Sequence, residues 1–176
     1  QSERMIGARA GIPDPAGRHL LVLARDPDGY ATLCRAISAA QRRGGSKGRP
    51  VYDLDELTAL ADGHWLVLTG CRKGTVPAAL AVGGADGARA AARELDRLIA
   101  LFGRENVAVE LTDHGHPNDS DHIDALAGLA ARFDLPTVVT GNVHYAVPDR
   151  RRLATALAAV RSRRSASSLP SSTSAM

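Results

Sequence analysis

The segment at positions 137–145 constrains the fold of this chain most strongly. It begins with four β-branched residues, which favour a buried strand, and it continues into Gly141, Asn142 and His144. Loops at the carboxyl ends of strands carry the ligands and metals of α/β proteins. An extended backbone would direct Asn142 and His144 to one face, as two neighbouring metal ligands require. Taken alone, however, an Asn-x-His triplet such as 142–144 is more often part of a capped loop whose histidine faces water.

Strand-like and helix-like segments alternate along the whole chain. Strands are expected at 18–24, 65–69, 107–111 and 137–140, and helices at 30–43, 54–61, 85–102, 119–133 and beyond Pro148. This alternation predicts an α/β fold with mostly parallel strands and outer helices. Four parallel strands do not close a barrel. The chain therefore forms either an open sheet or part of a (β/α) barrel.

Composition places the chain among ordinary globular proteins. Of its 176 residues 44% are hydrophobic and only 3% aromatic, so leucine, valine and alanine must fill the core. The net charge of +3 does not establish nucleic-acid binding, and two cysteines favour a reducing cytoplasm over a disulfide framework. There is no apolar run near the ~18 residues that a membrane span needs. We expect an irregular segment at 1–16, a folded region at 17–164 and a disordered serine-rich tail at 165–176.

Several residues could carry chemistry. Cys71 follows a predicted strand within a glycine-bounded basic loop, where it could be a nucleophile, a metal ligand or a small buried filler. The same loop could instead bind phosphate through Arg72 and Lys73. His19 opens the first predicted strand and is read as a core histidine. His64 has no evident partner and is read as structural.

Four blocks in a fixed order resemble one known family. They are HLLVLARD with the following GYATLCRAIS, then LTGCRKG, ELTDHG and TGNVHY. Together they resemble the N-terminal PHP (polymerase and histidinol phosphatase) domain of the bacterial DNA polymerase III alpha subunit. The forms ELTDHG and TGNVHY are more similar to its error-prone branch. The resemblance covers roughly positions 15 to 164.

The resemblance implies a distorted (β/α)7 barrel with metal sites at one mouth. This chain is expected to form an incomplete version of that barrel, because the family's first strands and first histidine pair would lie upstream. The family's ligand positions fall on His19, Cys71, Asn142 and His144, and the implied cofactor is a divalent zinc or manganese ion. Asn142 stands where many relatives have aspartate, and its neutral oxygen would hold a hard cation less firmly.

The function implied is that of a piece of an error-prone DNA polymerase III alpha-type protein, which copies DNA in damage-tolerant replication and repair. Its implied partners are DNA and the rest of the polymerase chain, in the cytoplasm and without a membrane. The PHP region is expected to be catalytically degenerate here. Two alternatives remain: a free-standing PHP-type metal-dependent phosphoesterase, and a non-catalytic nucleic-acid-binding module that uses Arg150, Arg151 and Arg152.

Overall fold

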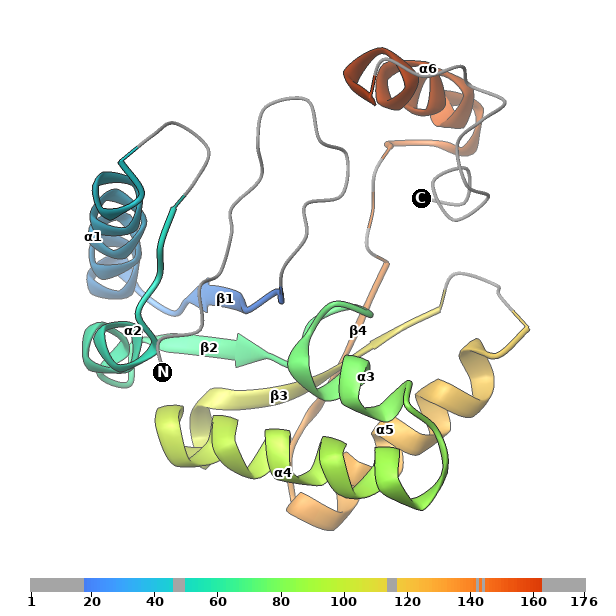
Figure 1. Cartoon of the computed structure of the whole chain (residues 1–176), viewed down its shortest axis with the longest axis horizontal. Helices are drawn as coiled ribbons and strands as arrows, with labels where there is room; N and C mark the ends of the chain where they lie inside the picture. The colour runs from blue at the N-terminus through green and yellow to red at the C-terminus, as the bar shows by residue number, and fades with distance from the viewer. Residues whose placement is uncertain (1–17, 46–49, 114–116, 142, 144, 163–176) are drawn as a thin grey trace.

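A four-stranded mixed sheet with helices packed against it forms the body of the protein (Figure 1). The computed structural model describes residues 18–45, 50–113, 117–141, 143 and 145–162. The strands run in the order β1 (Leu21–Ala24), β2 (Trp65–Leu68), β3 (Val107–Thr112) and β4 (Thr137–Thr140). The helices are α1 (Pro27–Arg43), α2 (Leu54–Ala61), α3 (Thr75–Leu80), α4 (Gly84–Phe102), α5 (Asp119–Phe133) and α6 (Arg151–Ser162), with short 3-10 turns η1 (Arg104–Asn106) and η2 (Pro148–Arg150). The α/β class expected from the sequence is confirmed. The segments 1–16 and 165–176 lie outside the described residues.

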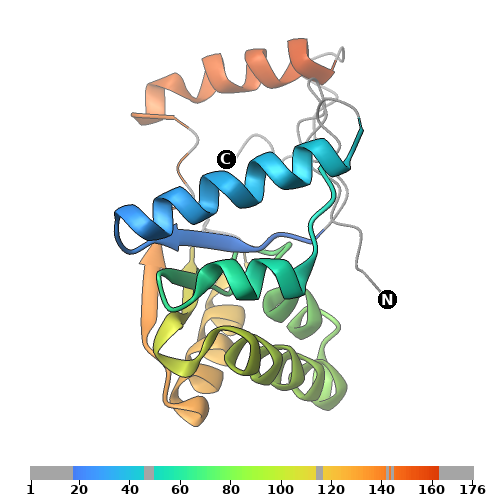
Figure 2. The ribbon, with the colours of Figure 1, turned by 90° about the vertical axis from the view of Figure 1, so that its left-hand side faces the viewer.

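The sheet is parallel except at one edge. β2 pairs with β3 and β3 pairs with β4 in parallel, whereas β1 pairs with β2 in antiparallel register, with Leu21 opposite Leu68 and Ala24 opposite Trp65. The connection from β1 to β2 contains two contacting helices, α1 and α2 (Figure 2). The connection from β2 to β3 also contains two helices, α3 and α4, and yet gives a parallel pair, so the path of the connection and not its number of helices sets the strand direction.

The segment 26–29, which resembles a turn in the sequence, is the start of α1. The Asp26 carboxylate accepts a hydrogen bond from the Gly29 N–H at 2.7 Å, which caps the helix, and Pro27 occupies its first turn. Helix α4 ends as expected at Gly103, whose φ of 85° lies in the left-handed region that glycine adopts without strain.

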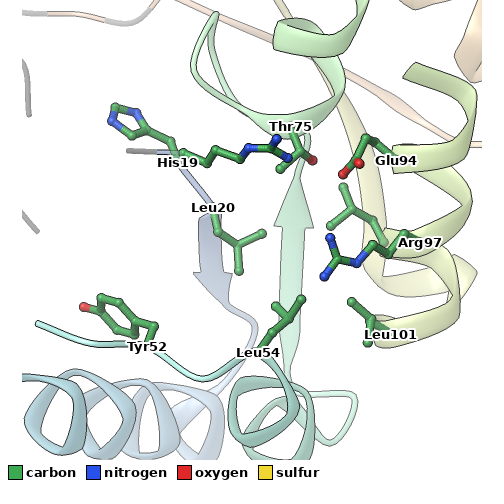
Figure 3. Close-up of a pocket in the computed structure, with 10 residues that line it drawn as sticks. His19, Leu20, Tyr52, Leu54, Thr75, Glu94, Arg97 and Leu101 are labelled. Atoms are coloured by element: carbon green, nitrogen blue, oxygen red, sulfur yellow. The ribbon is translucent and has the colours of Figure 1, made fainter. Parts of the chain in front are cut away.

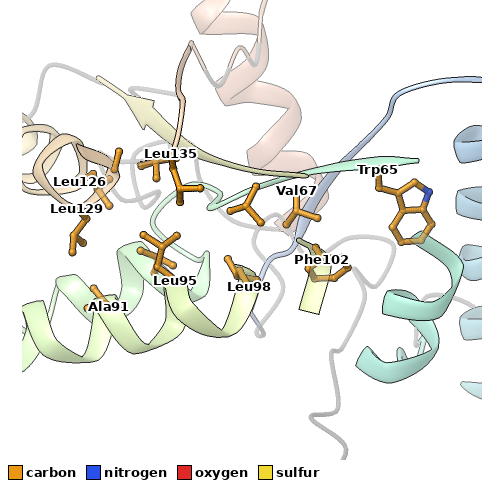
Figure 4. Close-up of a cluster of buried hydrophobic side chains, with 14 of the residues drawn as sticks. Trp65, Val67, Ala91, Leu95, Leu98, Phe102, Leu126, Leu129 and Leu135 are labelled. Atoms are coloured by element: carbon orange, nitrogen blue, oxygen red, sulfur yellow. The ribbon is translucent and has the colours of Figure 1, made fainter. Parts of the chain in front are cut away.

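The main hydrophobic core lies between the sheet and the helices α4 and α5 (Figure 4). Val67, Val107 and Val109 are fully buried on the sheet, and Leu95 of α4 packs among them with 0% exposure. At one end of this core lies Trp65, which is 1% exposed. Its indole N–H donates to the Gly29 carbonyl at 2.9 Å. The core is therefore mainly aliphatic, with Phe102 of α4 and with Trp65, whose hydrogen bond fastens α1 to β2.

Helix α6 lies apart from α4 and α5 in both views (Figures 1 and 2). Leu153 and Leu157 on this helix are each 51% exposed. Across the part of the chain that the structure describes, we find no helix with the length and apolar character needed to cross a membrane.

Candidate metal centre

Cys71 lies on a tight loop directly after β2. Gly70 has a φ of 80°, a conformation that few other residues adopt, and it turns the chain away from the sheet. The Gly74 N–H then donates to the Cys71 carbonyl at 2.6 Å and closes the loop. Gly74 is required here, because an added Cβ would lie 1.9 Å from the Thr69 carbonyl oxygen. These two glycines hold the Cys71 side chain at the strand end, half-buried and open to solvent on one side.

His19 meets Cys71 across the first pair of strands. It forms a parallel bridge with Gly74, and its backbone N–H donates to the Lys73 carbonyl at 2.9 Å. Its imidazole Nδ1 lies 3.8 Å from the Cys71 Sγ. The antiparallel β1 explains why a histidine at the start of a strand reaches this site: the start of β1 lies beside the end of β2.

The spacing of this pair fits joint coordination of one metal ion. Zinc binds thiolate at about 2.3 Å and imidazole nitrogen at about 2.0 Å, so a tetrahedral angle separates the two donor atoms by about 3.6 Å. The observed distance of 3.8 Å is close to that value. His19 and Cys71 are thus spaced as two donors to one tetrahedral metal ion would be.

Asn142 and His144 lie outside the described residues. The structure nevertheless places the end of the strand that precedes them. β2, β3 and β4 are parallel, so Thr140 at the end of β4 lies at the same edge of the sheet as the Cys71 loop. Within the described ranges there is no group of three or more His, Cys, Asp or Glu side chains arranged to hold a metal.

A shallow pocket opens next to His19, between β1, α2, α3 and α4 (Figure 3). Leu20, Leu54 and Leu101 line it, with Glu94 and Arg97 at its margin. The His19 ring points away from these leucines. The pocket therefore borders the His19–Cys71 pair without including the Cys71 sulfur among its lining groups.

The three arginines proposed for nucleic-acid contact lie together at the junction of η2 and α6. Arg150, Arg151 and Arg152 are all exposed. They follow the extended residue Val147, well separated along the chain from the Cys71 loop. The structure thus presents three positive charges on one short segment of the chain.

Sequence reasoning missed an ion pair between Asp26 and His64. The His64 Nδ1 lies 2.7 Å from the Asp26 Oδ2, while the other carboxylate oxygen caps α1. The hydrogen bond from His64 and the one from the Gly29 N–H lower the pKa of Asp26, and the bond to Asp26 raises the pKa of His64. The only signal in the sequence was the helix-capping position of Asp26, because its partner lies 38 residues away.

Glu110 was also missed as a residue of interest. It lies within the β3 strand yet is only 6% exposed, with its Oε1 accepting a hydrogen bond from the Thr140 hydroxyl at 2.6 Å. A carboxylate that directly follows the apolar run 107–109 within a strand was the available signal.

Comparison with known proteins agrees with the resemblance in the sequence. The family model of the PHP domain matches residues 3–114. The error-prone DNA polymerase of Mycolicibacterium paratuberculosis is 54% identical over 158 residues, which is 90% of this chain and 14% of that protein. The error-prone DNA polymerase of Cutibacterium acnes is 53% identical over 168 residues, with 93% of this chain and 14% of the relative covered.

A further relative has the same name and similar coverage. The error-prone DNA polymerase of Nocardia farcinica is 50% identical over 160 residues, which is 89% of this chain and 14% of that protein. The chain thus spans about 14% of the length of these curated relatives. The match of the family model over most of the chain, together with these relatives, shows that the chain belongs to the PHP domain family.

Proposed function

We propose that this chain serves as the PHP region of an error-prone DNA polymerase. The supporting observation is the 54% identity over 90% of the chain with proteins of that name. In such a protein the sheet would be part of a PHP-type (β/α)7 barrel, and the region would act beside a polymerase module that copies damaged DNA. The partners would be DNA and the remaining polymerase chain, in the cytoplasm. This chain covers only 14% of the length of that relative. We therefore propose polymerase activity for the whole protein and not for this chain.

We propose further that the edge of the sheet formed by the Cys71 loop and the end of β4 holds a divalent metal ion. His19 and Cys71 are the described donors, and Asn142 and His144 complete the proposed set. Nitrogen and sulfur donors favour zinc over magnesium. A bound ion of this kind would polarise a phosphate oxygen or lower the pKa of a bound water.

The neutral amide of Asn142 would limit catalysis at this site. It offers one neutral oxygen donor where a carboxylate would add charge, so it would hold a hard divalent cation less firmly. We therefore propose a structural role for the metal. It would tie together the start of β1, the end of β2 and the loop after β4, and the PHP region would be a platform for the polymerase module.

Metal analysis of the purified chain tests this proposal. We expect close to one zinc per chain after reconstitution and dialysis. The Cys71→Ala, His144→Ala double variant should retain at most a tenth of that content, because two of the four proposed donors are gone. Cys34→Ala is the matched control, since Cys34 is exposed on α1 and lies outside the site. Equal zinc content in the wild type and the double variant would refute the ligand assignment.

A further inference from the structure

The side of β4 that faces away from β3 is an open strand edge. In the strand order β1-β2-β3-β4, β4 pairs with β3 and with no other strand in the described part of the chain. Residues 135–141 carry no charge, and no proline lies within the strand itself. In contrast, β1 at the opposite side of the sheet is bounded by Arg18 and Arg25. Folded proteins usually protect an open edge with a charge, a proline or a bulge, because an unprotected edge pairs with another strand.

The register of β4 against β3 determines which backbone groups of β4 point outward. The Pro136 carbonyl accepts a hydrogen bond from the Val109 N–H at 2.9 Å, and Val109 is the register partner of Thr137. In a parallel pair, alternate residues direct both their N–H and their C=O groups to the same neighbouring strand. The even-numbered residues of β4 therefore face β3. The odd-numbered residues direct their N–H and C=O groups to the open edge, and these are Thr137, Val139 and Gly141.

The side chains along this edge are also uncovered. Val139 lies on the same face of the sheet as the fully buried Val109, yet its exposed fraction is 81%. Thr137, on that face too, is exposed. Helix α5 packs against β3 and leaves these two side chains in solvent. There is thus room beside β4 for a further strand.

We propose that β4 pairs with β4 of a second copy of this chain, in antiparallel orientation, about a twofold axis at Val139. The axis places Val139 opposite Val139 of the partner subunit, and Thr137 opposite Gly141 of the partner subunit. Each facing pair exchanges two backbone hydrogen bonds, because all these residues direct their N–H and C=O groups outward. The facing side chains are uncharged, and two exposed valines bury each other at the axis.

The backbone selects this register over its nearest alternative. An axis at Val138 would place Gly141 opposite Leu135 of the partner subunit. The Leu135 N–H already donates to the Ala130 carbonyl at 2.9 Å, so that register forms fewer new hydrogen bonds. The three outward-facing residues are symmetric about Val139, so a single strand supplies both halves of the pairing. Such a self-complementary interface closes at the dimer and does not grow into a filament.

This pairing goes beyond the proposed polymerase function. In a whole PHP-type barrel, another strand of the same protein would occupy this edge of β4. The self-association is therefore predicted for this chain by itself and does not depend on the polymerase assignment. A short strand forms a small interface, so the dimer should be weak and should depend on protein concentration.

Sedimentation velocity of the purified chain between about 5 and 500 µM tests the proposal, with EDTA present so that no metal bridges two copies. We expect a reversible equilibrium between monomer and dimer. Val139→Lys places two like charges opposite each other at the axis, so its dimer affinity should fall at least tenfold. Val82→Lys is the matched control, because Val82 is 74% exposed and lies between α3 and α4. Its dimer affinity should stay within twofold of the wild type.

Four results would each overturn the proposal: a monomer throughout this range, an assembly that grows beyond the dimer, unchanged association in Val139→Lys, or an equal loss in Val82→Lys. Circular dichroism shows whether Val139→Lys is folded. If it is not, diamide cross-linking of Val139→Cys decides, in a background of Cys34→Ala and Cys71→Ala. The axis places the two substituted Cα atoms about 5.5 Å apart, within reach of a disulfide. Cross-linking faster than that of Val82→Cys supports the pairing, and equal or slower cross-linking overturns it.

Discussion

Asp26 and His64 join the start of α1 to the start of β2 through a single carboxylate. One oxygen of Asp26 caps the helix and the other binds the His64 ring at 2.7 Å. The His64 backbone carbonyl also accepts from the Arg25 N–H at 2.9 Å. The same carbonyl approaches Gly29 so closely that a Cβ there would lie 2.3 Å away. Asp26 and His64 therefore hold together the corner between β1, α1 and β2, and one of these contacts involves the titratable His64 ring.

The Asp26–His64 pair predicts a pH optimum for stability. Bonding to Asp26 raises the pKa of His64 above its usual 6.5, so this contribution is complete below that pH and is lost as the pH rises through the raised pKa. The pKa of Asp26 is lowered from 3.8, chiefly by His64, so its contribution is present above 3.8 and is lost as the pH falls through the lowered pKa. The pair therefore stabilises the fold most between these two pH values.

Thermal unfolding between about pH 5 and pH 9 measures this effect. The melting temperature of the wild type should decline on the alkaline side, and His64→Gln should remove that part of the slope. Asp26→Asn keeps the helix cap and should have the same effect as His64→Gln. High salt should flatten the wild-type slope, because the pair is exposed to solvent. Identical pH profiles for the wild type and His64→Gln would contradict the prediction.

Gly74 is the residue that shapes the Cys71 loop. An alanine there would place its Cβ against the Thr69 carbonyl, so Gly74→Ala should destabilise the protein by about 3 kcal/mol. Gly128→Ala is the matched control, because no atom lies within 4 Å of its added Cβ and it occupies an exposed turn of α5. The control should stabilise the protein by about 0.5–1 kcal/mol. Chemical denaturation measures the free energy of unfolding of both variants. Equal stability of the two would contradict the prediction, because it would mean that the Cys71 loop accommodates a side chain at position 74.

At the scale of elements, α4 contributes more buried residues to the core than any other helix. Leu95 is fully buried, so Leu95→Ala should lower the free energy of unfolding by about 3 kcal/mol through lost burial and a residual cavity. Leu153→Ala on α6 is the matched control: that leucine is 51% exposed, and its loss should cost less than about 0.5 kcal/mol. Urea denaturation of both variants measures the loss in the free energy of unfolding. Similar losses in the two variants would contradict this account.

The element boundaries were largely predictable because they depend on local chemistry. The range 54–61 was expected as a helix, and α2 has those bounds, with the Asp53 carboxylate accepting from the Glu56 N–H at 3.0 Å as its N-cap. Periodicity could not show that β1 is antiparallel, because that depends on the path of the connection between the strands. It also could not show that Glu110 is buried, since burial depends on which neighbour covers it.

The candidate site was only partly predictable, because it too depends on which strands lie side by side. Cys71 at a strand end followed from the glycines around it. His19 entered through the resemblance alone, because local reasoning places ligands after strands and His19 precedes one. The pairing of Leu21 with Leu68 brings that position to the edge of the sheet where β2 ends. Asn142 and His144 lie outside the described residues, so their part in the site stays a prediction.

At the scale of the whole molecule, Arg150, Arg151 and Arg152 are the proposed contact with DNA. The three exposed arginines should add salt-dependent, sequence-independent affinity for single-stranded DNA. Replacing all three with alanine should reduce the slope of log affinity against log salt by about 2, since each phosphate contact contributes roughly 0.7. Fluorescence anisotropy at several salt concentrations measures the slope. An unchanged slope would place the DNA contact elsewhere or exclude it.

Cobalt substitution tests the metal centre most directly. Co²⁺ replaces zinc in tetrahedral sites, and its bond to a thiolate produces a charge-transfer absorption that oxygen and nitrogen ligands alone do not give. We predict this absorption in the wild type and in Cys34→Ala, its loss in Cys71→Ala, and its weakening in His19→Ala, whose imidazole lies 3.8 Å from the sulfur. An absorption that persists undiminished in Cys71→Ala, or that is absent from the wild type at saturating Co²⁺, would contradict a metal centre built on the His19–Cys71 pair.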